Sequence, residues 1–300
     1  MVRIFAGNSK GYDSPMPDEA LRNVSDTALW VAQYRVMESE RPDALFRDPL
    51  AGKLVGERGA EIVRRMKVGG MAWPMIVRTA VMDEIILRVV REHAVDVVLN
   101  LAAGLDTRPY RLALPPALRW VEADLPPILA AKNEALAGET PVCRRETIAA
   151  DLTDPRARRE VFAQASEGSR AVLTVTEGLL AYLGESDVAG LATDLHAGGA
   201  FRWWLIDLAS PRLKKILDRK VGKHVEAARS PFRFAPAAGT KFFDPFGWRE
   251  IEFRSTFEEG LRLDRKPPLA RVFWLLSRLQ GEAKREELRR MGGIALLERV

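Results

Sequence analysis

Apolar residues fall at helical spacing in two stretches near the start of the chain. Between residue 74 and about residue 93 they recur every four positions, and Pro74 suits the first turn of such a helix. The positions are Val77, Val81, Ile85 and Val89. A similar pattern predicts an earlier helix over residues 27–39, with Asp26 as its N-terminal cap.

From residue 95 onward the pattern changes to short, continuous apolar runs, which are typical of strands buried on both faces. We predict strands at 95–101, 119–124, 147–151, 171–176, 201–207, 250–255 and 294–300. Helical stretches are expected at 106–114, 126–136, 155–165, 185–196 and about 269–290. This alternation predicts a doubly wound α/β fold with a mostly parallel sheet.

Two segments do not follow the alternation, and they set the predicted domain organisation. Residues 1–24 contain little periodicity and read as a loose arm. Residues 210–243 carry many basic residues and phenylalanines, and we interpret them as a lid inserted over the carboxyl edge of the sheet. We therefore expect an N-terminal arm and helical lid over 1–74 and the main α/β domain over 75–300, with the lid insertion at about 210–243.

Composition narrows the class of protein. The 300 residues suffice for one large core, and no run approaches the length of about 18 apolar residues that a membrane span requires. Cys143 is the only cysteine and there are three histidines, which excludes a disulfide and disfavours a zinc site. With no signal-peptide pattern at the N-terminus, we expect a cytoplasmic protein.

The net charge of +5 admits a nucleic-acid partner, but basic and acidic residues alternate almost everywhere. We therefore predict no nucleic-acid partner, and the absence of a long apolar run predicts no membrane partner. The same charge would suit a small anionic substrate.

Candidate chemistry lies just after the strands, because ligands of such sheets bind at the carboxyl ends. Gly104 follows the first strand and permits a tight turn against a ligand. A single glycine there is not the three-glycine turn of dinucleotide enzymes, and a plain strand–helix turn is an equal alternative. Asp124 ends the second strand and could accept both ribose hydroxyls of an adenosine, or could cap the next helix.

The third and fourth strands end in further candidates. Asp151 could bind an adenine amino group while Leu152 packs on the ring, or Asp151 could form an Asx turn. Glu177 could bind an ammonium group or position a substrate. Tyr182 could orient a substrate or simply pack in the core.

Four stretches in register resemble the successive signatures of the leucine carboxyl methyltransferase family, and its bacterial branch best. They are residues 25–29 (SDTAL), 103–111 (AGLDTRPYR), 122–126 (EADLP) and 177–183 (EGLLAYL). The resemblance implies a class I methyltransferase fold, with seven strands, the last antiparallel, and a helical lid. It also implies S-adenosyl-L-methionine as cofactor and S-adenosyl-L-homocysteine as product.

The resemblance also assigns roles to single residues. Arg78 should pair with the methionine carboxylate, although an arginine on a helix is more often at the surface. Ala103 and Gly104 should line the cofactor, Asp124 should hold the ribose, and Glu177 should lie at the methionine end. Asp151 and Leu152 should hold the adenine. The family usually has glycine where this chain has Ala102, whose methyl group could narrow the cofactor's path.

The expected reaction is in-line methyl transfer to an oxygen. A carboxylate acceptor is ionised at neutral pH and needs no general base, whereas a phenol or alcohol usually benefits from one. His93 and His196 lie outside the predicted site loops and His224 lies in the lid, so the absence of a base mildly favours a small carboxylic acid.

The lid does not identify the acceptor. Its basic and aromatic residues could enclose an anionic aromatic molecule or form a structural flap. They are Arg229, Arg233, Lys241, Phe232, Phe234, Phe242 and Phe243. A hydroxyl acceptor, a nicotinamide-dependent oxidoreductase and a noncatalytic binding protein are the alternatives.

Overall fold

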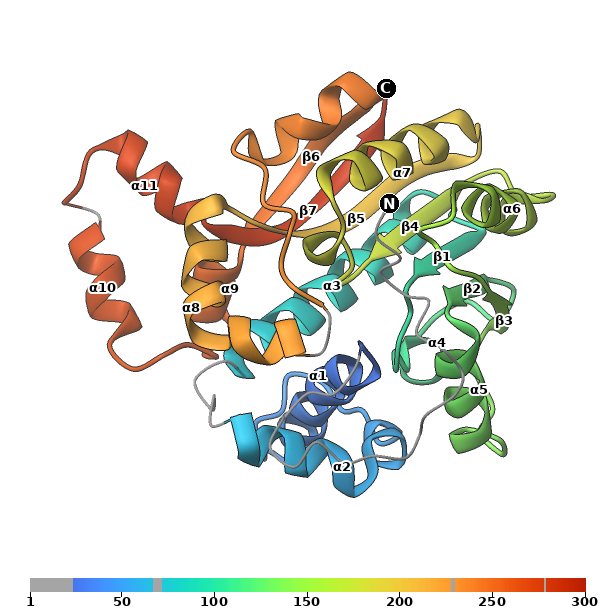
Figure 1. Cartoon of the computed structure of the whole chain (residues 1–300), viewed down its shortest axis with the longest axis horizontal. Coiled ribbons are helices and arrows are strands. Elements are labelled where there is room, and N and C mark those ends of the chain that lie inside the picture. The colour runs from blue at the N-terminus through green and yellow to red at the C-terminus, as the bar shows by residue number, and fades with distance from the viewer. Residues whose placement is uncertain (1–23, 67–71, 228–229, 278) are drawn as a thin grey trace.

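The computed structural model describes residues 24–66, 72–227, 230–277 and 279–300, and a seven-stranded sheet forms its centre (Figure 1). The strand order is β3-β2-β1-β4-β5-β7-β6. The strands are β1 (Val97–Leu101), β2 (Arg119–Asp124), β3 (Arg144–Ala149), β4 (Val172–Thr176), β5 (Phe201–Ala209), β6 (Trp248–Ser255) and β7 (Gly292–Arg299). All pairs from β3 to β5 are parallel, whereas β7 runs antiparallel to β5 and β6.

The continuous apolar runs form the centre of the sheet because both of its faces are covered. Every residue of β1 and β4 is buried, whereas β3 at the edge is largely exposed. On one face, Val98, Trp120 and Leu205 pack against α3 (Ala72–Glu92). On the other face, Leu99 and Trp204 pack against the two helices α6 (Pro155–Ser166) and α7 (Glu185–Ala197). The predicted doubly wound fold is therefore confirmed.

The remaining helices lie around the carboxyl edge of the sheet and at one end of the molecule (Figure 1). They are α1 (Val24–Ser39), α2 (Ala51–Met66), α4 (Arg108–Arg111), α5 (Pro126–Ala135), α8 (Pro211–Ala227), α9 (Thr256–Arg262), α10 (Ala270–Ser277) and α11 (Glu282–Arg289). Among the described residues there are also two short 3-10 helices, Leu180–Tyr182 and Gly239–Phe246. No helix in the described ranges is both long and apolar enough to cross a membrane.

Several predicted boundaries were wrong. Asp26 is not a cap, because α1 already begins at Val24 and Asp26 forms an ion pair with Arg58 of α2 at 2.7 Å. The helix expected over 106–114 is the four-residue α4, since the charged side chains of this segment turn inward to bind one another.

Three other expectations also need correction. The third strand begins three residues earlier and ends two residues earlier than expected, so that Asp151 lies in the loop after it. The helical stretch expected over 269–290 is divided into α10 and α11. The helices α2 and α9 were not predicted. The predicted arm over 1–24 lies almost entirely outside the described residues.

Candidate active site

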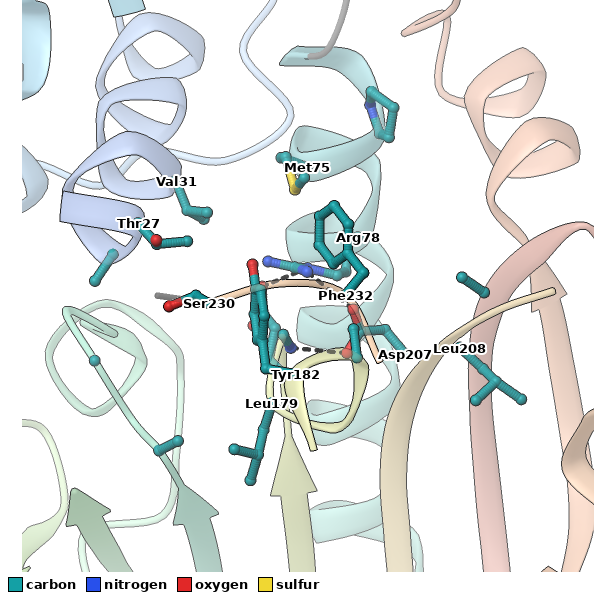
Figure 2. Close-up of a pocket in the computed structure, with 18 of the residues that line it drawn as sticks. Thr27, Val31, Met75, Arg78, Leu179, Tyr182, Asp207, Leu208, Ser230 and Phe232 are labelled. Carbon is teal, nitrogen blue, oxygen red and sulfur yellow. Dashed lines mark hydrogen bonds and ion pairs between the residues drawn. The ribbon is translucent and has the colours of Figure 1, made fainter. Parts of the chain in front are cut away.

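A cavity of about 460 Å³ lies at the carboxyl ends of the parallel strands, and all the residues predicted for the site line it. They are Arg78, Ala103, Gly104, Asp124, Asp151, Leu152, Glu177 and Tyr182. Figure 2 shows its middle part, where Arg78 from α3, Tyr182 and Phe232 come together. At one end the cavity is formed by the turns after β1, β2 and β3, and at the other by α8, α9 and the start of β7.

The turn after β1 has the backbone geometry that its sequence predicts. Gly104 has a φ of 50°, a left-handed conformation that favours glycine. Ala102 also has a positive φ, 52°, although it carries a β-carbon. This conformation costs a non-glycine residue about 1–2 kcal/mol. The backbone is therefore strained at Ala102, and a glycine at this position would relieve the strain.

Asp124 closes the same end of the cavity. Its Oδ2 accepts a hydrogen bond from the Gly104 N–H at 2.6 Å, and its Oδ1 accepts one from the Leu125 N–H at 2.7 Å. The N-cap residue of α5 is Leu125, whose side chain makes no capping hydrogen bond, and Asp124 lies one position before it, so Asp124 is not the N-cap. Burial raises the pKa of Asp124 above its usual value, although the two backbone donors oppose this.

Asp151 and Leu152 line the wall next to Asp124. Oδ1 of Asp151 accepts hydrogen bonds from the N–H and the hydroxyl of Thr153, at 3.0 and 2.7 Å. The Asx turn considered as an alternative therefore forms, and it fixes the carboxylate in the cavity wall. Leu152 packs against the core beneath. A role toward an adenine ring stays a prediction for both residues.

In the middle of the cavity, Arg78 joins two carboxylates from neighbouring strands. Its Nε donates to Glu177 and its Nη1 to Asp207, both at 2.9 Å. Its side chain is only 13% exposed, so it is not the surface arginine considered as an alternative. Asp207 also accepts the Gly178 N–H at 2.7 Å, and this bond ties the turn after β4 to β5.

Arg108 extends this network beneath the cavity floor. It pairs with three carboxylates, Asp83 at 2.6 Å, Asp106 at 2.9 Å and Glu177 at 2.7 Å, and is 2% exposed. Burial alone would raise the pKa of Glu177, but Arg108 and Arg78 outweigh it and hold that pKa at about 2. Glu177 is therefore ionised at neutral pH, and its carboxylate is paired with the guanidinium groups of both Arg78 and Arg108.

Sequence reasoning missed this network, although part of its signal was present. Arg108 and Asp106 lie in the quoted stretch 103–111 but received no role there. Asp207 follows the pattern of an acidic residue near the end of a strand, as Asp124 and Glu177 do. Asp83 gave no signal, because a single acidic residue in an amphipathic helix is normally exposed.

Tyr182 lies over the network and stacks on Phe232 from the segment after α8. The ring centroids are 5.5 Å apart and the planes are inclined by 25°. Burial raises the pKa of the Tyr182 phenol to about 12, although the positive charge of Arg78 lowers it in part. The hydroxyl therefore stays protonated at neutral pH.

The predicted aromatic and basic enclosure was wrong in part. Phe232 and Phe234 line the cavity, but Phe242 and Phe243 do not, and Phe243 is fully buried in the core. The side chains of Arg233 and Lys241 are exposed and lie outside the cavity lining, because they extend from the outer side of the segment. Arg229 lies outside the described residues.

None of the described cavity-lining residues is a histidine. His93 follows the end of α3 and stacks near Trp203, and His196 contacts the Val300 carbonyl. The side chain of His224 in α8 lies outside the described part of the chain. In the same described part, no group of three or more side chains is arranged to hold a metal ion.

The residues at the β1–β3 end fit an adenosyl ligand without phosphates. Asp124 offers an acceptor-only carboxylate beside the glycine turn, where ribose hydroxyls can donate. Thr27 of α1 also lines this cavity, and its buried hydroxyl has no partner among the described residues. The turn after β1 carries a single glycine, unlike the three-glycine turn that binds the diphosphate of a dinucleotide.

Solved structures with this architecture define the class of the fold. A DUF574 family protein from Streptomyces avermitilis aligns with a TM-score of 0.58 at 16% identity, over 90% of this chain and 97% of that chain. A protein from Thermobifida fusca described as a methyltransferase aligns with a TM-score of 0.57 at 15% identity, over 95% and 99% of the two chains. The fold is that of a class I methyltransferase.

Sequence comparison gives the family. A model of the leucine carboxyl methyltransferase family matches residues 28–196. A protein of Parafrankia sp., named as an S-adenosyl-L-methionine-dependent methyltransferase, is 38% identical over 286 residues, 86% of this chain and 88% of that protein. One of Streptomyces coelicolor with the same description is 36% identical over 176 residues, 54% of this chain and 60% of that protein. The chain belongs to the leucine carboxyl methyltransferase family, and it is an enzyme that uses S-adenosyl-L-methionine.

Proposed function

We propose that this enzyme transfers a methyl group to a carboxylate oxygen of a small molecule. The proposal rests on the protonation states of two side chains in the cavity wall near Arg78. Glu177 there has a pKa of about 2 and is bound by two arginines, and Tyr182 has a pKa of about 12. Neither group can remove a proton from a hydroxyl acceptor near pH 7.

A carboxylate acceptor needs no such base, because it is already ionised at neutral pH. The bound cofactor supplies an electrophilic methyl group on a sulfonium. The protein then has to align the acceptor oxygen with that methyl group and to exclude water. The cavity wall around Tyr182 and Phe232 is suited to this, since stacking fixes both rings.

The residue roles within the proposal follow from position. Asp124 holds the ribose, Ala103 and Gly104 line the cofactor, and Asp151 with Leu152 holds the adenine. Arg78 and Glu177 bind the charged methionine end, and Tyr182 orients the acceptor. Arg78 and Glu177 already form an ion pair. The methionine end of the cofactor carries one carboxylate and one ammonium group, so it can bind to both side chains without adding net charge to the cavity.

The N-terminal helices and α8 are the proposed lids. Thr27, Val31 and Arg35 of α1 line the cavity from one side, and Leu213, Leu217 and Val221 of α8 line it from the other. Residues 1–74 would then act as one lid and the segment 210–243 as the second, both on the catalytic domain 75–300.

The test is a comparison of matched acids and alcohols as acceptors, for example 3-phenylpropanoic acid with 3-phenylpropanol and decanoic acid with decanol. The enzyme is supplied with methyl-labelled S-adenosyl-L-methionine, and base-labile methyl esters are separated from base-stable ethers. The proposal expects label in esters only. Ether formation from the alcohols, with a rate that rises steeply with pH, would contradict it and would assign a hydroxyl acceptor instead.

A further inference from the structure

The helix α10 exposes more large apolar side chains than a folded domain normally leaves in water. Val272, Phe273, Leu275 and Leu276 are each more than half exposed, and Leu269 just before the helix is 78% exposed. Five successive residues of the helix, 272–276, are apolar, so the apolar surface continues around it. A contiguous patch of this kind normally marks an interaction surface.

This helix lies next to the far end of the cavity. The ring of Phe273 contacts that of Phe257, at 5.7 Å between centroids, and Phe257 lines the cavity. The following helix α11 is joined to α8 by an ion pair between Arg212 and Glu287 at 2.9 Å. In Figure 1, α10 and α11 lie outside the sheet at the same end of the molecule as α8.

The helix α8 carries an exposed basic stripe at this end of the molecule. It contains six basic and two acidic residues, and its inner side chains Leu213 and Leu217 line the cavity. Lys215, Arg219 and Lys223 follow one another at intervals of four and are exposed. Among the described residues, no carboxylate pairs with these three positive charges.

We propose that α10 and the basic stripe of α8 together dock the enzyme on an anionic lipid surface. Apolar and aromatic side chains on a short helix enter the boundary between headgroups and acyl chains, and lysines and arginines nearby attract anionic headgroups. The expected absence of a membrane partner rested on the length of apolar runs. An eight-residue helix cannot span a bilayer, but it can lie in its interface.

A second copy of the chain is the other occupant to consider for α10. It would bring its own basic stripe to the same end of the molecule, where the like charges would repel. A bilayer rich in anionic lipid provides the opposite charge, so charge complementarity favours the lipid surface.

Docking there would also bring the end of the cavity that Leu213, Leu217 and Phe257 line close to the lipid surface. If the proposed function is correct, this arrangement favours an acceptor acid with a long apolar tail that partitions from the bilayer. The docking itself does not depend on that step.

The experiment measures cosedimentation of the full chain with sucrose-loaded vesicles of pure phosphatidylcholine or of phosphatidylcholine with 30% phosphatidylglycerol. We expect binding to the anionic vesicles, weakened by salt and at least tenfold weaker on the neutral ones. The pair Leu275→Gln and Leu276→Gln should reduce binding at least tenfold. Its matched control is Val142→Gln with Ile251→Gln, two exposed apolar residues elsewhere, which should bind normally.

A second set of variants tests the charge. Lys215→Gln, Arg219→Gln and Lys223→Gln together should reduce binding to anionic vesicles by on the order of 100-fold at low salt, from about fivefold for each cation. The control removes three exposed arginines elsewhere, Arg91, Arg156 and Arg170, and should change binding less than threefold.

Three outcomes would overturn the proposal. The first is equal binding of wild type and of the Leu275/Leu276 variant. The second is the absence of vesicle binding together with a concentration-dependent dimer, seen by sedimentation, that the same variant abolishes. The third is vesicle binding that is seen only after residues 1–23 are removed. This result would mean that α10 binds residues 1–23 and not the lipid surface. Binding of S-adenosyl-L-homocysteine, measured in parallel, separates all of these from a failure of the proposed function.

Discussion

The two ends of the cavity are built in different ways. The end at β1–β3 consists of strand–loop turns, in which backbone N–H groups bind carboxylates at fixed distances, as at Asp124 and Gly104. The end at α8–α11 is lined by apolar side chains of helices, such as Leu213, Leu217 and Phe257. The first end is therefore suited to one defined ligand, whereas the second can admit acceptors that differ in shape. Arg78, Glu177 and Tyr182 lie where the two ends meet.

The largest expected effect comes from breaking the charge network between the two ends. Arg108→Met leaves Asp83, Asp106 and Glu177 buried with too little positive charge, and we expect a loss of about 3–5 kcal/mol in the free energy of unfolding. Urea titration measures it. Arg170→Met, an 86%-exposed side chain, is the control and should cost less than about 1 kcal/mol. Equal losses of unfolding free energy in the two variants would mean that the ion pairs of Arg108 do not stabilise the fold.

The same network predicts how stability depends on pH. The folded pKa of Glu177, about 2, lies below its usual value of 4.5. Its contribution is therefore complete above about pH 4.5 and is lost as the pH falls toward 2, by about 3 kcal/mol. The stability difference between wild type and Glu177→Gln should shrink by that amount from about pH 5 to about pH 2. A pH-independent difference would contradict the ionised, arginine-bound state of Glu177.

A smaller effect is expected at Tyr182, which lies where the two ends of the cavity meet. Tyr182→Phe keeps the stacking on Phe232 but removes the hydroxyl, so an acceptor-orienting role predicts about a tenfold loss of kcat/KM, or about 1.4 kcal/mol. The affinity for S-adenosyl-L-homocysteine should stay within about twofold. If affinity and stability fall instead while kcat/KM for the acceptor holds, Tyr182 is a packing residue.

The smallest effect concerns the strained turn at the cofactor end. Ala102→Gly relieves a positive φ but adds freedom to the unfolded chain, and we expect a net gain of about 0.5–1 kcal/mol. Affinity for the product should rise slightly, because a methyl group leaves the cavity wall. Thermal unfolding and calorimetry measure the two effects. A destabilised variant would show that the alanine methyl is packed rather than strained.

The sequence predicted the β1–β3 end, which we propose binds the cofactor, better than the α8–α11 end, which we propose admits the acceptor, for a physical reason. Gly104, Asp124, Asp151 and Glu177 each lie at or just after the end of a parallel strand, and parallel strands bring their carboxyl ends to one edge of the sheet. Local pattern and global topology therefore specify the same positions. The alternation of apolar runs and helices was sufficient for the sheet and for α3, α5, α6 and α7.

The acceptor end depends on contacts between distant segments, which no local pattern reveals. Phe243 and Phe232 have similar neighbours in the sequence, yet one is buried in the core and the other lines the cavity. The pairing of Arg78 with Asp207, 129 positions apart, is likewise visible only in the fold.

The central claim is that the β1–β3 end binds the adenosyl group of the cofactor through Asp124. Titration calorimetry with S-adenosyl-L-homocysteine tests it on the wild type and on Asp124→Asn, with NADH as the competing ligand. We predict binding of the thioether, weakened by about 1–3 kcal/mol in the variant, and weakening of wild-type binding as the pH falls through the raised pKa of Asp124. NADH binding without thioether binding, or equal affinity of both proteins for the thioether, would contradict the account.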